Sequence, residues 1–205
     1  MTAGPTSLTQ DEVSSSTTRC RILATAERFF REIGYQKTTV ADIAKTLGMS
    51  PANVYRFFDS KKSINEAVVE RLIGEVETLI SRVADRPGLS ASERMREIIL
   101  ALHRDSIERI TAHPRIHEMV EAGMTESWEV CHHHVERITA VLARVIAEGK
   151  AAGEFRVADP AHAAGCIQTA ILRYCHPVLI VRCPGDVAPP IDGMIDFLLG
   201  GLRAG

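Results

Sequence analysis

The chain has 205 residues, a formal net charge of −2 at pH 7 and a hydrophobic fraction of 45%. This length suits one medium domain, or a small domain joined to a larger one, and it allows a sizeable core. No segment reaches about 18 uninterrupted apolar residues, so the sequence predicts no membrane span. The N-terminus lacks a basic patch followed by an apolar run, which argues against a signal peptide and favours a cytoplasmic protein.

The charge distribution and the cysteines indicate the kind of partner and the redox state of the protein. Residues 1–62 carry a net charge of +3, whereas residues 63–205 carry −5. A basic front end on an acidic body indicates that the front end meets an anionic partner. The five cysteines are irregularly spaced without a C-x-x-C pair, which favours reduced thiols over a disulfide framework. Residues 1–18 are polar and rich in Ser and Thr, and they are predicted to form a disordered tail.

Apolar residues recur with helical spacing along almost the whole chain. In the first predicted helix one face carries Ile22, Ala26, Phe29, Phe30 and Ile33, and Gly34 is placed to end it. Thr39 is a candidate N-cap for a second helix, and Ser50 followed by Pro51 predicts the start of a third. A long helix begins near Ser60. Further helices are expected at about 90–112, 114–124, 126–152, 159–183 and 190–203. Pro177 is expected to kink the helix at 159–183.

The prediction is therefore an all-α fold of about nine helices, without internal repeats. Its N-terminal part, residues 19–62, is predicted to be a three-helix helix-turn-helix domain. Residues 63–205 are predicted to form a larger helical domain.

The helix-turn-helix prediction rests on the spacing of four residues in "TTVADIAKTLGMSPANVYRFFDSKK". Counting from Val40, Ala44 stands at position five, Gly48 at nine and Val54 at fifteen. A small residue at the crossing lets the helices approach, Gly tolerates a positive φ in the turn, and Val54 packs inward. The second of these helices then turns Ala52 and Arg56 outward, with Asn53 and Tyr55 beside them.

These outward residues suit the major groove of double-stranded DNA. Arg can pair with guanine, Asn with adenine, and Ala can touch a thymine methyl group. Hydroxyl and amino groups near the helix N-termini can hold phosphates. Arg19 and Arg21 lie before the first predicted apolar face and could reach the backbone or an adjacent minor groove. The candidate DNA-binding residues are Thr39, Ser50, Ala52, Asn53, Tyr55, Arg56 and Lys61.

Residues 19–72 resemble the N-terminal domain of the TetR family of transcriptional regulators. The motifs are an apolar helix ending in Gly-Tyr, a Thr-Thr-hydrophobic helix start, Ile-Ala, Leu-Gly-hydrophobic-Ser, Tyr-x-x-Phe and Ser-Lys-Lys. Phe57 departs from the pattern, because members often carry His or Tyr there and Phe cannot donate to phosphate. Ile64 stands where Leu is usual.

The resemblance implies a homodimer whose C-terminal helices enclose a ligand pocket. The predicted last two helices carry the candidate interface residues Cys166, Ile171, Ile191, Met194, Ile195, Leu198, Leu199 and Leu202. Candidate pocket residues mix apolar surface with polar groups: His103, Met119, Met124, Trp128, His132, Gln168 and Tyr174. The nature of the ligand does not follow from them.

A metal site and an enzyme active site are less consistent with the sequence. The run Cys131–His134 invites a metal site, but neighbouring residues on a helix diverge by about 100°, so they cannot all bind one ion. The sequence contains no P-loop, no G-x-S-x-G, no H-E-x-x-H and no Gly-rich nucleotide turn, so it carries none of these enzyme motifs. The sequence predicts a regulator without a cofactor. The resemblance implies a repressor that a small-molecule inducer releases from a palindromic operator, although the sequence does not separate a repressor from an activator. The alternative is a helical metal-binding or interaction protein in which the helix-turn-helix is only structural.

Overall fold

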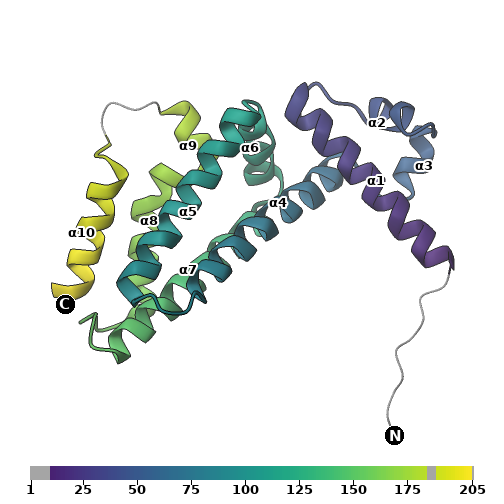
Figure 1. Cartoon of the computed structure of the whole chain (residues 1–205). Coiled ribbons are helices and arrows are strands. Elements are labelled where there is room, and N and C mark those ends of the chain that lie inside the picture. The colour runs from purple at the N-terminus through teal and green to yellow at the C-terminus, as the bar shows by residue number, and fades with distance from the viewer. Residues whose placement is uncertain (1–9, 184–187, 205) are drawn as a thin grey trace, which may run out of the picture.

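The computed structural model describes residues 10–183 and 188–204, and within them the chain forms ten α-helices and no strand. The N-terminal helices are α1 (Gln10–Glu32), α2 (Val40–Thr46), α3 (Pro51–Tyr55) and α4 (Lys61–Ala84). They are followed by α5 (Ala91–Ala112), α6 (Ile116–Glu126), α7 (Trp128–Ala151), α8 (Pro160–Cys175), α9 (Pro177–Arg182) and α10 (Ile191–Ala204). The predicted all-α fold class is confirmed (Figure 1).

The N-terminal helices share one hydrophobic core. Fully buried side chains from α1, α2, α3 and the first half of α4 meet there, among them Phe30, Ile43, Val54 and Ile64. Two glycines make the tight connections. Gly34 follows α1 with a φ of 94°, and Gly48 lies between α2 and α3 with a φ of 67°. Both values lie in the left-handed region that favours glycine.

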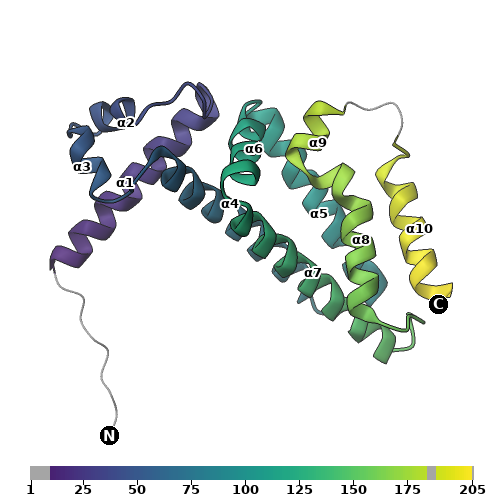
Figure 2. The same cartoon turned by 180° about the vertical axis from the view of Figure 1, so that it is seen from behind.

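Helix α4 joins the two parts of the molecule without a linker. Its first half packs in the N-terminal core through Val68 and Leu72, and its second half packs in the body through Ile80 and Ala84. Figures 1 and 2 show it running from beneath α1 into the body. Any division near residue 62 therefore cuts the chain at the start of a continuous helix.

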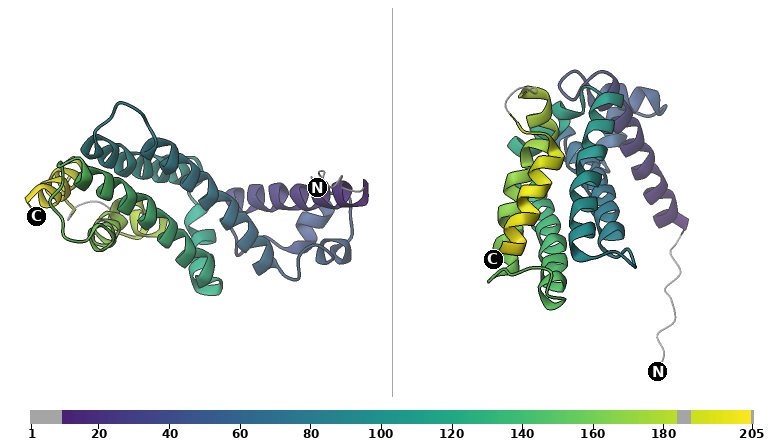
Figure 3. Two further views of the ribbon diagram at one scale, coloured as in Figure 1. Left: turned by 90° about the horizontal axis from the view of Figure 1, so that it is seen from below. Right: turned by 60° about the vertical axis from the view of Figure 1, so that its left-hand side comes forward.

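A second core fills the body. It is built by inward faces of α4, α5, α7, α8 and α10, with Met95, Leu142, Ile146, Phe155 and Ile195 among its buried side chains. Helices α8 and α10 lie at the end of the molecule far from α1–α3, as Figure 3 shows. No helix in the described residues is long and apolar enough to cross a membrane.

Two boundaries differ from the sequence prediction. Helix α1 begins at Gln10, so residues 10–18 are helical and the predicted disordered tail is wrong for them, while residues 1–9 lie outside the described part. Extending a nucleated helix costs little, and residues 10–18 contain neither Gly nor Pro to stop it. The predicted 159–183 helix is two helices, because Pro177 begins α9 after a break at His176.

Candidate DNA interface and ligand groove

The recognition helix α3 is held by two local features. The Ser50 side chain caps it by accepting a hydrogen bond from the Asn53 amide at 3.3 Å, and Pro51 occupies its first turn. Val54 is fully buried and anchors the helix to the N-terminal core. As a consequence Ala52, Tyr55 and Arg56 are exposed on its outer side, and Asn53 is half-buried beside them.

The start of α2 is closed by a capping box. Thr39 Oγ1 accepts a hydrogen bond from the Asp42 amide, and the Asp42 carboxylate accepts one from the Thr39 amide, each at 3.1 Å. The Thr39 hydroxyl also donates to Asp42 at 2.6 Å. These hydrogen bonds from Thr39 lower the pKa of Asp42. A phosphate that reached Thr39 would have to compete with this carboxylate.

Lys61 lies differently from the sequence expectation. Its ammonium group donates to the backbone oxygens of Tyr35, Gln36 and Thr38 at 2.9, 3.4 and 3.2 Å. Burial lowers the pKa of Lys61. These contacts hold the loop between α1 and α2, so in this structure the Lys61 charge is directed at the protein backbone and not outward.

Exposed cations that the sequence analysis did not select also belong to this domain. Lys37 precedes the α2 N-cap by two residues, and Lys45 lies in the last turn of α2. The net positive charge of residues 1–62 was the available signal for them. Arg19, expected to approach DNA, lies over the Phe58 ring at 4.7 Å from its centroid, and Phe57 packs against the N-terminal core.

The seven predicted pocket residues do not meet in one cavity. Met119 is fully buried in the N-terminal core, whereas Trp128 is 60% exposed and stacks on the exposed His132. Met124 and Gln168 are half-buried. The prediction selected the seven residues by side-chain type, and side-chain type does not determine where helix packing places a residue.

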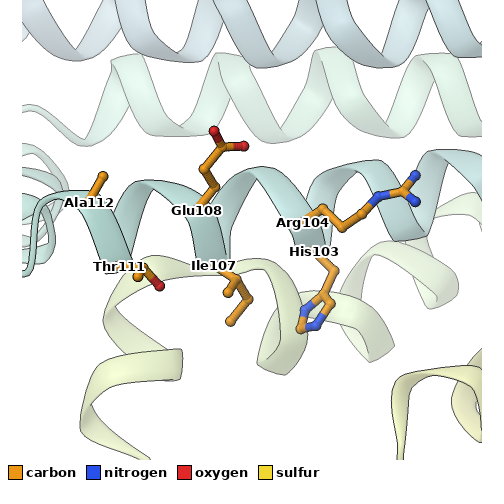
Figure 4. Close-up of a pocket in the computed structure, with 6 residues that line it drawn as sticks. All are labelled: His103, Arg104, Ile107, Glu108, Thr111 and Ala112. Atoms are coloured by element: carbon orange, nitrogen blue, oxygen red, sulfur yellow. The ribbon is translucent and has the colours of Figure 1, made fainter.

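His103 and Tyr174 are brought together. His103 Nδ1 lies 2.7 Å from the Tyr174 backbone oxygen, and both residues line an open pocket of about 200 Å³ between α5, α8 and α9. An open groove of about 430 Å³ adjoins it along α5 and shares His103 and Ile107 with it. Figure 4 shows His103, Ile107 and Thr111 along one side of α5, with Glu108 pointing away. Most of the exposed area of the groove is apolar, and His103, Arg104, Glu108 and Thr111 add polar groups, a mixture found in small-molecule sites.

The predicted interface residues divide into two groups. Ile171, Ile195, Leu199 and Leu202 are buried in the core of their own chain, and their part in a dimer interface stays a prediction. The half-buried residues are Ile191, Met194 and Leu198, and Cys166 is exposed. Phe197 was missed, although at 76% it is the most exposed of the large exposed apolar side chains in the described residues.

The Cys131–His134 run spreads around α7 as its helical spacing requires. His132 lies 3.3 Å from Glu136 on the surface, and His134 Nδ1 lies 2.9 Å from Glu77 Oε1 on α4. In residues 10–183 and 188–204 no three His, Cys, Asp or Glu side chains gather in a way that could hold a metal ion. All five cysteines are free.

Comparisons with known proteins place this architecture in a family. Residues 22–68 match the family model described as bacterial regulatory proteins, tetR family, and residues 91–187 match the tetracyclin repressor-like C-terminal domain. The regulator ArpR of Pseudomonas putida is 26% identical over 192 residues, which cover 88% of this chain and 91% of ArpR. YvaF of Bacillus subtilis strain 168, an HTH-type regulator, is 30% identical over 82 residues, 40% of this chain and 43% of YvaF.

A solved structure supports the same fold. The TetR/AcrR-family regulator from Thermobifida fusca superposes with a TM-score of 0.65 at 24% identity, over 92% of this chain and 98% of that one. The family models that match the N-terminal and the C-terminal parts both describe TetR-type domains. The structure contains the expected helix-turn-helix, with the side chains of α3 exposed on its outer side. The chain belongs to the TetR family and is a ligand-responsive, DNA-binding transcriptional regulator.

Proposed function

We propose that this protein is a homodimeric repressor that binds a palindromic operator and leaves it when a small molecule occupies the body. Residues 19–62 would bind DNA, and residues 63–205 would dimerise and bind the inducer. The observation that carries the proposal is the recognition helix, which buries Val54 and leaves Ala52, Tyr55 and Arg56 exposed. The similarity of residues 91–187 to a tetracyclin repressor-like domain supports repression over activation.

Base reading is assigned to the exposed side of α3. Arg56 is exposed and has no ion-pair partner among the described residues, so its guanidinium can take a guanine edge in the major groove. Arg56 is the C-cap of α3, and Asn53 and Ala52 lie about one turn before it on that helix. The proposed phosphate contacts are the α2 and α3 N-termini, together with Lys37 and Lys45 as exposed cations.

Dimerisation is assigned to the outer faces of α8 and α10. Phe197 projects from α10, and Gly193, Gly200 and Gly201 on that helix and Gly165 on α8 have open space at the position of a Cβ. A two-fold interface uses the same patch on both copies, so it needs a projection and a recess on one surface. The outer faces of α8 and α10 offer both, because Phe197 projects and the four glycines leave open space.

Signalling between the two parts would pass through α6 and its N-cap Arg115. The Tyr35 hydroxyl donates to Glu126 at 2.9 Å, and Arg115 donates to the Ile33 backbone oxygen at 2.9 Å. Asn65, buried in α4, donates to the Met119 backbone oxygen at 3.3 Å. A ligand shifts DNA binding only by the difference in its affinity for two states. We propose that these contacts differ between the states.

The inducer site is assigned to the open pocket of about 200 Å³ and its adjoining groove beside His103. His103 Nδ1 faces the Tyr174 carbonyl, which requires a proton on that nitrogen and leaves Nε2 as an acceptor in the neutral ring. The surroundings favour a largely apolar molecule with a hydrogen-bond donor. Its identity is open.

The decisive experiment is selection of random DNA duplexes by the purified full-length protein at near-physiological salt, followed by sequencing. We expect enrichment of a palindrome whose half-sites are spaced by about one helical turn, 10–10.5 bp, or a multiple of it. Arg56→Ala should weaken operator binding by about 1–3 kcal/mol and relax the preference at one base pair. An Arg56→Ala protein with unchanged affinity and preference would refute the assignment of base reading.

A further inference from the structure

The outer face of α8 carries two metal-ligating side chains one turn apart. Ala164, Ile167 and Ile171 on the inner face are buried in the body core. His162 and Cys166 lie on the opposite face and are exposed. Because they are spaced i and i+4, their side chains stack over each other on one side of the helix.

The two ligating atoms already lie close to the separation that a metal ion imposes. His162 Nε2 is 3.8 Å from Cys166 Sγ. In a tetrahedral Zn²⁺ site, Zn–S and Zn–N distances of about 2.3 and 2.0–2.1 Å place nitrogen and sulfur roughly 3.6 Å apart. A small change of side-chain torsion is therefore enough for both atoms to bind one ion.

One chain supplies only half of such a site. No group of three potential ligands is present in the described part of the chain, and structural zinc takes four ligands. The missing half can come from a second copy, because the proposed dimer surface includes this face of α8. A two-fold axis passing beside α8 would bring the same imidazole and thiol from the other copy. This step rests on the homodimer of the proposed function.

We propose that two copies of the chain bind one Zn²⁺ ion between their α8 helices through His162 and Cys166 of each copy. On binding, each Cys166 thiol releases its proton to solvent, and the two thiolates balance the charge of the ion. Two imidazoles and two thiolates form a Cys₂His₂ set, which suits Zn²⁺. The ion then links metal availability to dimer formation and so to operator binding.

The test is a Co²⁺ titration of the metal-free, full-length protein under reducing conditions. Co²⁺ replaces Zn²⁺ in tetrahedral sites and gives visible bands together with a thiolate-to-metal charge-transfer band. We expect saturation at one ion per two chains and displacement of Co²⁺ by Zn²⁺. The variants His162→Ala and Cys166→Ser should each weaken binding by more than about 100-fold, because the loss of outer-shell partners alone costs 10–100-fold. Cys20→Ser, which removes another exposed thiol, is the matched control and should bind normally.

Three results overturn the proposal: saturation at one ion per chain, unchanged binding by Cys166→Ser, or no tetrahedral Co²⁺ spectrum. The oligomeric state and operator binding of the same protein, measured without and with added Zn²⁺, separate this failure from failure of the proposed function. A dimer that binds its operator and takes up no Co²⁺ refutes the metal site alone. A protein that stays monomeric and selects no DNA both without and with added Zn²⁺ refutes the proposed function beneath it.

Discussion

Lys61 lies across the loop that precedes the helix-turn-helix, with its Nζ 2.9 Å from the Tyr35 backbone oxygen and 4.2 Å from the centroid of the Tyr35 ring. One side chain at the start of α4 thus satisfies carbonyl groups at the end of the α1–α2 loop and pairs with an aromatic face. Because α2 begins at the end of this loop, Lys61 positions the whole α2–α3 unit against α4.

Replacing Lys61 by Met should therefore act on stability and not on phosphate binding. We expect the free energy of unfolding to fall by about 1–3 kcal/mol, since three carbonyl groups lose their donor. The slope of operator affinity against salt should stay unchanged, whereas loss of one phosphate contact would reduce it by about 0.9. Chemical denaturation and binding at several salt concentrations check both. Lys62→Met, at an exposed neighbour, is the control. A reduced slope for Lys61→Met would restore it as a phosphate contact.

Tyr35→Phe removes the hydroxyl that bonds Glu126 and keeps the ring, which packs edge-on against Phe30 with centroids 5.3 Å apart. The Tyr35 hydroxyl is half of a link between the DNA-binding part and the α6–α7 junction. We expect stability to drop by about 0.5–1.5 kcal/mol. Operator affinity without inducer should hold, while the effect of inducer on that affinity should shrink. Operator titrations with and without inducer measure the difference, and an unchanged inducer effect would exclude this link from signalling.

Two histidines inside the body predict a pH dependence of stability. Burial lowers the pKa of both His134 and His176 below the usual value. The Glu77 carboxylate raises the pKa of His134 and so partly offsets the effect of burial, whereas the nearby Arg137 lowers it. His134 in turn lowers the pKa of His176. Because the folded-state pKa values are lower than the unfolded ones, the unfolded chain binds more protons between them, and stability falls as pH drops below about 6.5.

Melting temperatures measured from pH 7.5 to 5 should show this fall, and His134→Gln or His176→Gln should flatten it. Carboxylates titrate mostly below this window and contribute little there. His133→Gln, which changes an exposed neighbour on α7, serves as the control and should keep the wild-type slope. Equal slopes in all four proteins would show that these histidines do not control stability.

Gly149 is required by close packing. A Cβ built there would lie 2.5 Å from Phe155 Cε2 and 2.7 Å from Ala91 Cβ. Gly149→Ala should therefore destabilise the body by about 1–3 kcal/mol through overpacking. Gly74 in α4 has open space at the same position, so Gly74→Ala should be neutral or stabilise by up to about 1 kcal/mol, by helix propensity. Thermal unfolding of the two variants compares them directly, and equal melting temperatures would contradict the packing argument.

The sequence by itself determined the helices, their order and the helix-turn-helix. Those features are local: the spacing of Val40, Ala44, Gly48 and Val54 sets a turn and a crossing, and side-chain periodicity follows from 3.6 residues per turn. Capping residues such as Thr39 and Ser50 acted within three positions of their partners. The sequence also marked Pro177, but as a kink within one helix, whereas the structure ends α8 at Cys175 and begins α9 at Pro177.

Only the tertiary structure decided which faces are buried and which charges are already used. Lys61 looked free because its three acceptors lie 23 to 26 residues away in the chain. Leu199 and Trp128 were both apolar residues on helices, yet one is 4% and the other 60% exposed. Which apolar stripe meets the core depends on how the helices cross, and that depends on the packing of the whole body, which no local pattern contains.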